Sequence, residues 1–288
     1  MNSKLKTDEE DWDLCISANN SLASVNIQEL WQYRDLLIMF VKRDIITVYK
    51  QTILGPIWFI VQPLLTTIIF VVLFGRIAGL SPEGVPQFAF YLISITMWSY
   101  FSETLNITSK TFTENASIFG KVYFPRLIIP LSKVISGFVK FLIQFSIFFL
   151  FWLYYLFVTK QVHPNLYIIF TPFFLLVLVL MALGFGILIT SITTKYRDLS
   201  FLVSFGVQLL MYATPVAYSM SNPKVQKHHL LLWLNPLTSI FEAFKYSFLG
   251  IGEYNIFWLT YSTVFTLILL FLGIVIFNKV DKSFIDTV

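Results

Sequence analysis

The sequence predicts an all-α polytopic membrane protein, and its composition and its apolar runs lead to that fold class. Hydrophobic types make up 57% of the 288 residues, and only 12% are charged. Soluble domains carry about 25% charged residues, and disordered chains are poor in apolar residues, so neither class fits. Several apolar runs also approach the roughly 20 residues that a membrane-spanning helix needs.

The first 50 residues are expected to form two parts. Residues 1–26 are an acidic cytoplasmic tail without the basic start of a signal peptide. Residues 27–50 are expected to form an amphipathic helix, because apolar residues recur at helical spacing, interrupted by Arg34. Asn26 and Glu29 have the spacing of a helix-capping pair. We expect this helix to lie along the inner leaflet; the alternative is a cytoplasmic helix packed on a partner.

The remaining residues, 51–288, are expected to form a transmembrane domain with six spans. The predicted spans lie at about residues 57–74, 88–107, 127–157, 166–192, 199–216 and 256–277. Before the last span, residues 219–250 contain apolar pieces that are too short to cross. We therefore expect re-entrant helices there, with a pair of extra spans, making eight, as the alternative.

The placement of lysine and arginine predicts that both termini are cytoplasmic. Basic residues gather in residues 1–56, 110–133, 195–197 and 279–282. The loops on the other side carry fewer, namely Arg76, Lys160, Lys224, Lys227 and Lys245. Cytoplasmic loops of membrane proteins are the ones enriched in basic residues.

The polar residues do not suggest an enzyme. Glu103 and Glu242 are the acids near apolar segments, and in the sequence each stands alone rather than beside a second catalytic group. The neighbours His228 and His229 lack the spacing of a helical metal-ligand pair, and the single cysteine excludes an internal disulfide. We therefore expect no catalytic residue and no metal site.

The energy source for any transport must lie outside this chain. Gly120-Lys121 is the one Gly-Lys pair, and Asn115 stands where a phosphate-binding loop would begin with glycine. Lys140 is a single deep charge, interpreted as a snorkelling or groove-facing lysine, and no repeat relates the two halves. A partner ATPase is therefore favoured over an ion gradient.

Four groups of short motifs, in order along residues 27–250, resemble the membrane subunits of ABC-2 type polysaccharide exporters. The motifs are Arg43-Asp44-Ile45 with Tyr49-Lys50-Gln51-Thr52, Leu54-Gly55-Pro56-Ile57-Trp58 and Gln62-Pro63-Leu64; Lys121-Val122-Tyr123-Phe124-Pro125-Arg126; Tyr196-Arg197-Asp198-Leu199 with Thr214-Pro215-Val216; and Leu234-Asn235-Pro236-Leu237. The resemblance implies a homodimer with two copies of a separate ATP-binding subunit, in the bacterial cytoplasmic (inner) membrane. It also implies a polyprenyl-pyrophosphate-linked glycan as cargo, and ATP and Mg bound by the partner rather than by this chain.

The resemblance also gives roles to individual residues. The cytoplasmic mouth would hold Leu54 and Gly55, with Arg43 and Lys50 either attracting the pyrophosphate or serving as positive-inside anchors. Contact with the ATPase would come from residues 102–126, through Glu114, Lys121 and Arg126, and from Arg197 and Asp198, which are also candidates for a local ion pair. The exit gate would contain Pro215, Asn235 and Pro236, in helices that could instead lie at the lipid interface.

Five aromatic residues on the first and fifth predicted spans are candidates for the lining of the passage: Trp58, Phe59, Phe201, Phe205 and Tyr212. Sugar rings present C–H faces that pack on aromatic planes, by analogy with base stacking in single-strand channels. The resemblance therefore predicts an O-antigen, capsule or teichoic-acid exporter. A drug or lipid exporter of the same superfamily and a membrane-embedded glycan-modifying enzyme are the alternatives.

Overall fold

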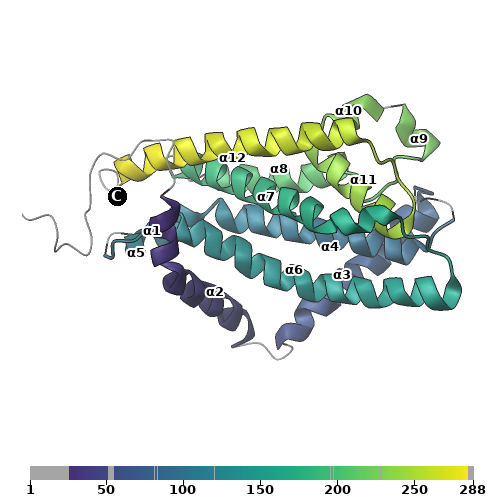
Figure 1. Ribbon diagram of the computed structural model, residues 1–288, viewed down its shortest axis with the longest axis horizontal. Helices are drawn as coiled ribbons and strands as arrows, with labels where there is room; N and C mark the ends of the chain where they lie inside the picture. The colour runs from purple at the N-terminus through teal and green to yellow at the C-terminus, as the bar shows by residue number, and fades with distance from the viewer. Residues whose placement is uncertain are drawn as a thin grey trace, which may run out of the picture.

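The computed structural model describes residues 26–50, 55–80, 82, 84–119, 121–194, 196, 198–227 and 229–284. Within these residues the regular structure is helical, and the long helices run side by side in one bundle (Figure 1). The predicted all-α class is confirmed for this part of the chain. At one end of the bundle lie α1 (Ile27–Gln32), α5 (Thr111–Phe119) and the last turns of α12 (Ile256–Phe284), and at the other lie α9 (Pro223–Gln226) and α10 (His229–Trp233).

The predicted N-terminal helix is present but bent. The backbone N–H of Glu29 donates to the Asn26 side chain at 3.1 Å, which confirms the predicted cap of α1. The helix bends at Tyr33 and continues as α2 (Arg34–Tyr49). The amide of Tyr33 still bonds to the Glu29 carbonyl, so the chain changes direction there without leaving helical hydrogen bonding. Trp31 and Met39 are exposed, whereas Phe40 is buried and Leu36 and Leu37 pack against the bundle, so only part of the apolar side of this helix is open.

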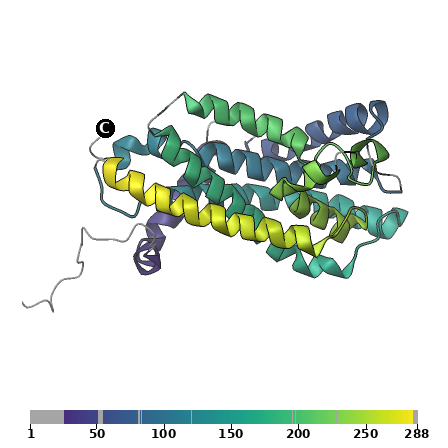
Figure 2. The same ribbon diagram turned by 90° about the horizontal axis from the view of Figure 1, so that it is seen from above.

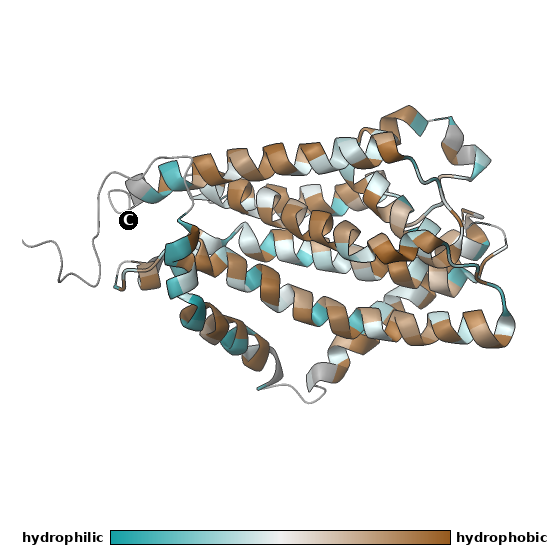
Figure 3. Cartoon of the chain, in the orientation of Figure 1, coloured by the Kyte–Doolittle hydropathy of each residue, from teal (hydrophilic) through white to brown (hydrophobic). Residues whose placement is uncertain are grey.

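Four helices are long and apolar enough to cross a membrane, which is the pattern of a multi-pass membrane protein. They contain α3 (Trp58–Phe70), α6 (Ile128–Tyr154), α7 (Thr171–Thr193) and α12. Two continue as a wider π-helical turn, η3 (Val71–Ile77) after α3 and η4 (Tyr155–Thr159) after α6, and η5 (Leu166–Phe170) precedes α7. In Figure 3 these helices are mostly brown, whereas α1, α2 and the C-terminal end of α12 carry most of the teal.

The other two predicted spans are helices of a different kind. α4 (Gln87–Thr108) has 22 residues but a more polar composition, and fifteen of them are buried. It packs against α3, α6, α7 and α11 (Pro236–Leu249), so other helices rather than lipid surround most of it. α8 (Leu199–Ala213) has 15 residues, or about 22 Å at 1.5 Å per residue, against a hydrocarbon core of about 30 Å.

The alternative with two extra spans requires longer helices than those described between residues 219 and 250. Residues 219–250 form α9, α10 and α11, of 4, 5 and 14 residues, and each is too short to cross. Twelve residues of α11 are buried, so this helix is packed inside the protein and does not lie on the surface as a lipid-interface helix. The Asn235-Pro236 pair, predicted as a turn between two helices, starts α11: Asn235 caps it and Pro236 occupies the first turn.

The buried apolar residues form three clusters along the bundle. The largest surrounds α4 with residues of α6, α7 and α11, including Phe141, Phe174 and Phe241. A second, around Phe112 and Phe277, joins α5 to the C-terminal end of α12. A third, around Met220 and Trp233, lies at the opposite end. Helices α3 and α8 lie along one edge of the molecule, on the side away from α12 (Figure 2).

Candidate functional site

The cations predicted at the mouth lie on α2 and differ in their surroundings. Arg43 Nη2 is 3.0 Å from Asp44 Oδ1, and its guanidinium lies 4.7 Å from the centre of the Phe40 ring. Asp44 Oδ2 also lies 2.9 Å from Lys133 Nζ on α6, so this group ties α2 to the bundle. Lys50, at the C-terminal end of α2, is exposed. Of the two candidates, Lys50 is therefore the more open to an anion.

Gly55 occupies a backbone conformation that favours glycine. Its φ is +48°, and it begins the short 3₁₀ turn η2 (Gly55–Ile57) that leads into α3. A Cβ built there would meet no atom within 4 Å. The requirement is therefore conformational and not steric. Leu54, its predicted companion, lies outside the described residues.

Helix α5, which lies within the segment expected to contact the ATPase, is joined to two long helices. The Phe112 amide donates to Thr190 Oγ1 at 3.3 Å, and Thr193 Oγ1 donates to the Ser109 carbonyl at 2.8 Å, both linking the α5 segment to α7. Phe112 also stacks on Phe277 of α12, with ring centres 4.7 Å apart. A force on α5 would therefore be passed directly to α7 and α12.

The residues predicted to contact an ATPase fall into two groups. Glu114, Lys121 and Asp198 are exposed and can meet a partner. Arg126 points into this chain instead: its Nε lies 2.6 Å from Asp281 Oδ1, and its Nη1 donates to the Asp281 carbonyl at 3.1 Å. Arg126 thus ties the start of α6 to the end of α12. Arg197 lies outside the described residues, so the local ion pair suggested for it stays a prediction.

Tyr123 connects the same loop to the N-terminal helix. Its hydroxyl donates to the Glu29 carboxylate of α1 at 3.4 Å. Partial burial, followed by the negative charge of Glu29, raises the pKa of the Tyr123 phenol. The phenol therefore remains protonated at neutral pH and keeps its donor role.

The residues predicted for the exit gate come together at the end of α8. Asn235 Nδ2 donates to the Ala213 carbonyl at 3.0 Å and to Thr214 Oγ1 at 2.9 Å, while Asn235 Oδ1 accepts from the Leu237 amide at 3.1 Å. One side chain thus caps α11 and holds the end of α8. The Pro215 carbonyl accepts a hydrogen bond from Lys245 of α11.

Glu242, described from the sequence as a lone acid, is paired. Lys245 Nζ lies 3.1 Å from Glu242 Oε1, and both side chains are at most 1% exposed. Lys245 also donates to the Tyr218 carbonyl at 3.5 Å, and Glu242 Oε2 accepts from the Glu253 amide at 3.3 Å. These four residues with Pro215 form a clasp that joins the segments before and after α11. The spacing of three residues between opposite charges in an apolar helix was the signal that sequence reasoning missed.

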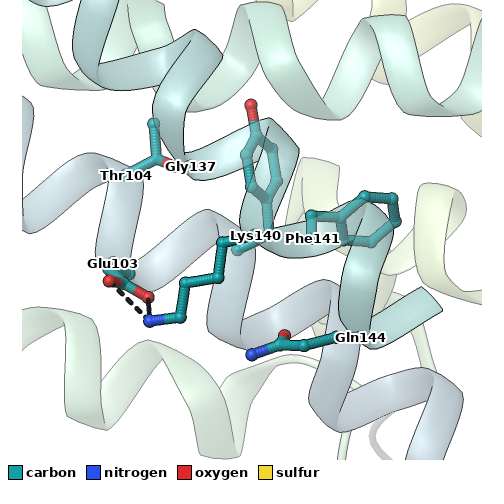
Figure 4. Close-up of a pocket in the computed structure, with 7 residues that line it drawn as sticks. Glu103, Thr104, Gly137, Lys140, Phe141 and Gln144 are labelled. Atoms are coloured by element: carbon teal, nitrogen blue, oxygen red, sulfur yellow. Dashed lines mark hydrogen bonds and ion pairs between the residues drawn. The ribbon is translucent and has the colours of Figure 1, made fainter. Parts of the chain in front are cut away.

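Glu103 is paired as well, across two helices. Lys140 Nζ of α6 lies 2.7 and 2.6 Å from the two carboxylate oxygens of Glu103 on α4. The two side chains, with that of Gln144, meet at one pocket between α4 and α6 (Figure 4). The ion pair is only partly shielded, since the Glu103 side chain is 39% exposed and that of Lys140 is 20% exposed. Lys140 is therefore a groove-facing lysine with a partner, and the sequence, which separates the pair by 37 positions, could not reveal it.

The five aromatic residues predicted to line the passage differ in the exposure of their side chains. Trp58 on α3 and Phe201, Phe205 and Tyr212 on α8 are exposed. Phe59 is buried and lies beneath Lys140, whose Nζ is 4.8 Å from the centre of its ring. On α8 only Val207 is buried among the described side chains, so this helix presents most of its surface outward.

The charged side chains described above form ion pairs that hold segments of the protein together. No group of three or more His, Cys, Asp or Glu residues that could hold a metal ion occurs in the described parts of the chain. The pairs Arg126–Asp281 and Lys140–Glu103 each join two segments of the bundle, whereas Glu242–Lys245 lies within α11.

Comparison with known proteins identifies the family of the chain. Residues 35–249 match the ABC-2 type transporter family. The chain is similar to a Klebsiella pneumoniae protein named O-antigen export system permease protein RfbA, with 29% identity over 255 residues, which cover 88% of this chain and 94% of that one. A Myxococcus xanthus protein of the same name is 26% identical over 221 residues, covering 76% and 82% of the two chains. The family match extends from α2 to the end of α11 and so includes the pocket, α5 and the Glu242–Lys245 pair: the chain belongs to the ABC-2 type transporter family.

Proposed function

We propose that the chain is the membrane subunit of an ATP-driven exporter that moves polyprenyl-pyrophosphate-linked polysaccharide, of the O-antigen kind, across the bacterial cytoplasmic membrane. The observation that carries the proposal is the similarity, over most of both chains, to permeases named for O-antigen export in two organisms. The absence of a phosphate-binding loop motif in the sequence fits a subunit that depends on a separate ATPase.

The working unit is a homodimer with two copies of the ATPase, which bind the ATP and Mg. In each subunit α3, α4, α6, α7, α8 and α12 cross the membrane, α9 to α11 are re-entrant, and both termini are cytoplasmic. α3 and α8 lie along one edge of the molecule and carry exposed aromatic residues there (Figure 2). This exposed apolar edge supports a passage between two copies of the chain. α8 is shorter than the other spans, and Asn235 at the start of α11 holds its end by hydrogen bonds.

Transport begins when the pyrophosphate reaches the mouth beside Lys50, Arg43 and the Gly55 turn. Closure of the ATPase dimer pushes on α5, and the contacts of α5 with α7 and α12 carry that displacement into the membrane domain. The glycan then passes along α3 and α8 toward the loop held by Asn235, while the lipid tail stays in the bilayer. This sequence assigns binding, coupling and gating to the chain and leaves hydrolysis to its partner.

The test is surface display of the glycan in a bacterium whose copy of this gene is deleted and whose ATPase gene is intact. We expect the reintroduced chain to restore display, and a hydrolysis-deficient ATPase to abolish it while the permease remains in the inner membrane. Display that persists without the chain, or a purified chain that modifies glycans by itself, would contradict the proposal. Export of a lipid or drug instead of a glycan would favour the alternative cargo within the same superfamily.

A further inference from the structure

One face of α4 is not completely buried. Most of α4 is covered by other helices, but in the half that ends beside α5 four polar residues remain partly accessible: Ser99, Ser102, Glu103 and Asn106. Their spacing of three, one and three places them on one side of the helix. We call these four residues the α4 polar strip. Accessible polar groups on a helix at membrane depth mark a path or a binding site.

The α4 polar strip is bordered by two exposed helices. On one border, Lys140 pairs with Glu103 and its Nζ lies over the Phe59 ring of α3. On the other border, Ser204 Oγ of α8 lies 3.3 Å from Asn106 Oδ1. The neighbours of Ser204 on its helix, Phe201 and Phe205, are exposed. The strip therefore runs between the helices that carry the aromatic lining candidates.

The pocket beside Glu103 is rich in groups that bind hydroxyls. It is lined by the carboxylate of Glu103, the ammonium of Lys140 and the side-chain amide of Gln144 (Figure 4). Tyr100 and Thr104 also line it, but their hydroxyl oxygens are buried beneath its surface, so the accessible polar groups are those of the Glu103–Lys140 pair. A carboxylate accepts several hydrogen bonds and an amide both donates and accepts, so this set can match the alternating donors and acceptors of a polyol.

The charge of the pocket argues for a neutral ligand. Glu103 and Lys140 cancel one another at 2.6 Å, so the site does not offer an unpaired cation to a phosphate. The buried Phe59 ring lies beneath the lysine ammonium, so it holds Lys140 in place and does not itself meet a ligand. A net-neutral set of hydrogen-bond donors and acceptors fits the hydroxyl groups at the edge of a sugar ring.

We propose that the α4 polar strip, with Lys140 and Gln144, is a sugar-binding subsite in the export path, where hydroxyl groups of the passing glycan exchange hydrogen bonds with the Glu103–Lys140 pair. The subsite rests on the proposed function, since it needs a glycan as cargo. It gives the passage a polar side on α4, opposite in character to the aromatic surfaces of α3 and α8. The glycan would slide by exchanging equivalent hydrogen bonds, so its movement would not depend on one particular sugar.

Two double variants distinguish a sugar-binding role of the Glu103–Lys140 pair from a role in helix packing alone. Glu103→Leu/Lys140→Leu removes every hydrogen-bonding group of the pair, whereas Glu103→Gln/Lys140→Gln removes the charges but retains donors and acceptors. Replacement of a shielded ion pair by apolar residues usually leaves stability unchanged or improved, so the leucine variant is expected to fold. Because two or more hydrogen bonds to sugar are lost, we expect the leucine pair to slow surface display about tenfold or more, and the glutamine pair about threefold or less.

The matched control is Ser146→Leu, a polar-to-apolar change on the exposed side of α6, which we expect to leave display unchanged. Thermal stability and co-purification with the ATPase are measured for each variant. Equal display by the leucine and glutamine pairs in folded complexes would overturn the subsite, because a purely structural pair would not distinguish them. A wild-type chain that displays no glycan would instead overturn the proposed function.

A second measurement does not depend on export rate. Cys15 is the only cysteine, so a Cys15→Ser background allows single cysteines to be placed. We expect Ser102→Cys to react with a membrane-impermeant thiol reagent in the ATPase-bound complex, and added O-antigen fragment to slow that reaction several-fold. Leu142→Cys, on the exposed apolar side of α6, should remain unreactive. Labelling of Ser102→Cys that the glycan fragment does not slow, or no labelling at all, would contradict a sugar-binding strip.

Discussion

The buried pair Glu242–Lys245 provides the sharpest prediction for stability. Lys245→Met has a similar length but removes the ammonium group. It would leave the Glu242 carboxylate buried without its cation, and the carbonyls of Pro215 and Tyr218 without their donor. Removal of one partner of a buried ion pair costs about 3–5 kcal/mol. We expect the free energy of unfolding of Lys245→Met to fall by about that amount.

The double variant Glu242→Leu/Lys245→Met tests the origin of this loss. It removes the uncompensated charge, so the remaining cost is that of the orphaned carbonyls and the Glu253 amide, at about 1–3 kcal/mol for a buried unsatisfied group. The double variant should therefore be more stable than Lys245→Met. The measurement is an SDS titration of purified protein in detergent, followed by circular dichroism. A loss of unfolding free energy below about 1 kcal/mol in Lys245→Met would refute the reasoning. So would a loss in the double variant equal to the sum of the losses in Lys245→Met and in Glu242→Leu alone.

Three further predictions concern the ends of the bundle. Gly55→Val should impair glycan display while dimer assembly persists, because valine strongly disfavours a φ of +48°; normal display would remove the turn from the gating mechanism. Arg126→Ala should lower ATPase-driven display several-fold with the ATPase still bound, since the tie to Asp281 is lost; a failure to bind the ATPase would instead make Arg126 a contact residue. Asn235→Ala should destabilise the protein by about 1–2 kcal/mol, measured by the same SDS titration, because α11 loses its cap; a stability equal to that of Thr238→Ser, a conservative change in the same helix, would contradict this.

Much of the helix pattern could be predicted because it follows from hydrophobicity and capping. Each of the six predicted spans coincides with a helix, and the Asn26 cap also agrees with expectation. The bend at Tyr33 could not be predicted, because the helical hydrogen bonds continue through it. The burial of α11 was missed because its composition resembles that of an amphipathic helix, while its polar residues Glu242 and Lys245 satisfy one another inside the protein.

The site was predictable only where its residues are close in sequence. Gly55 and the α5 segment were found from local motifs, whereas the partners of Lys140 and Arg126 lie 37 and 155 positions away. Pairing over such distances is set by helix packing, which a single sequence does not specify. For the same reason the sequence alone does not single out the α4 polar strip, although its periodicity is present there.

The weak attachment of α8 has a mechanical consequence. α7 and α12 share the most extensive contact between any two described helices, and α5 and Arg126 join the same body. α8, in contrast, buries a single described residue, Val207, and touches α4 and α7 only lightly. A hinge displacement of α8 would therefore break few van der Waals contacts, and the energy barrier to widening the passage would come mainly from rearranging lipid and the facing subunit. Among the described helices, α7 and α12 therefore form the most firmly packed part of the bundle, and α8 is held by far fewer contacts.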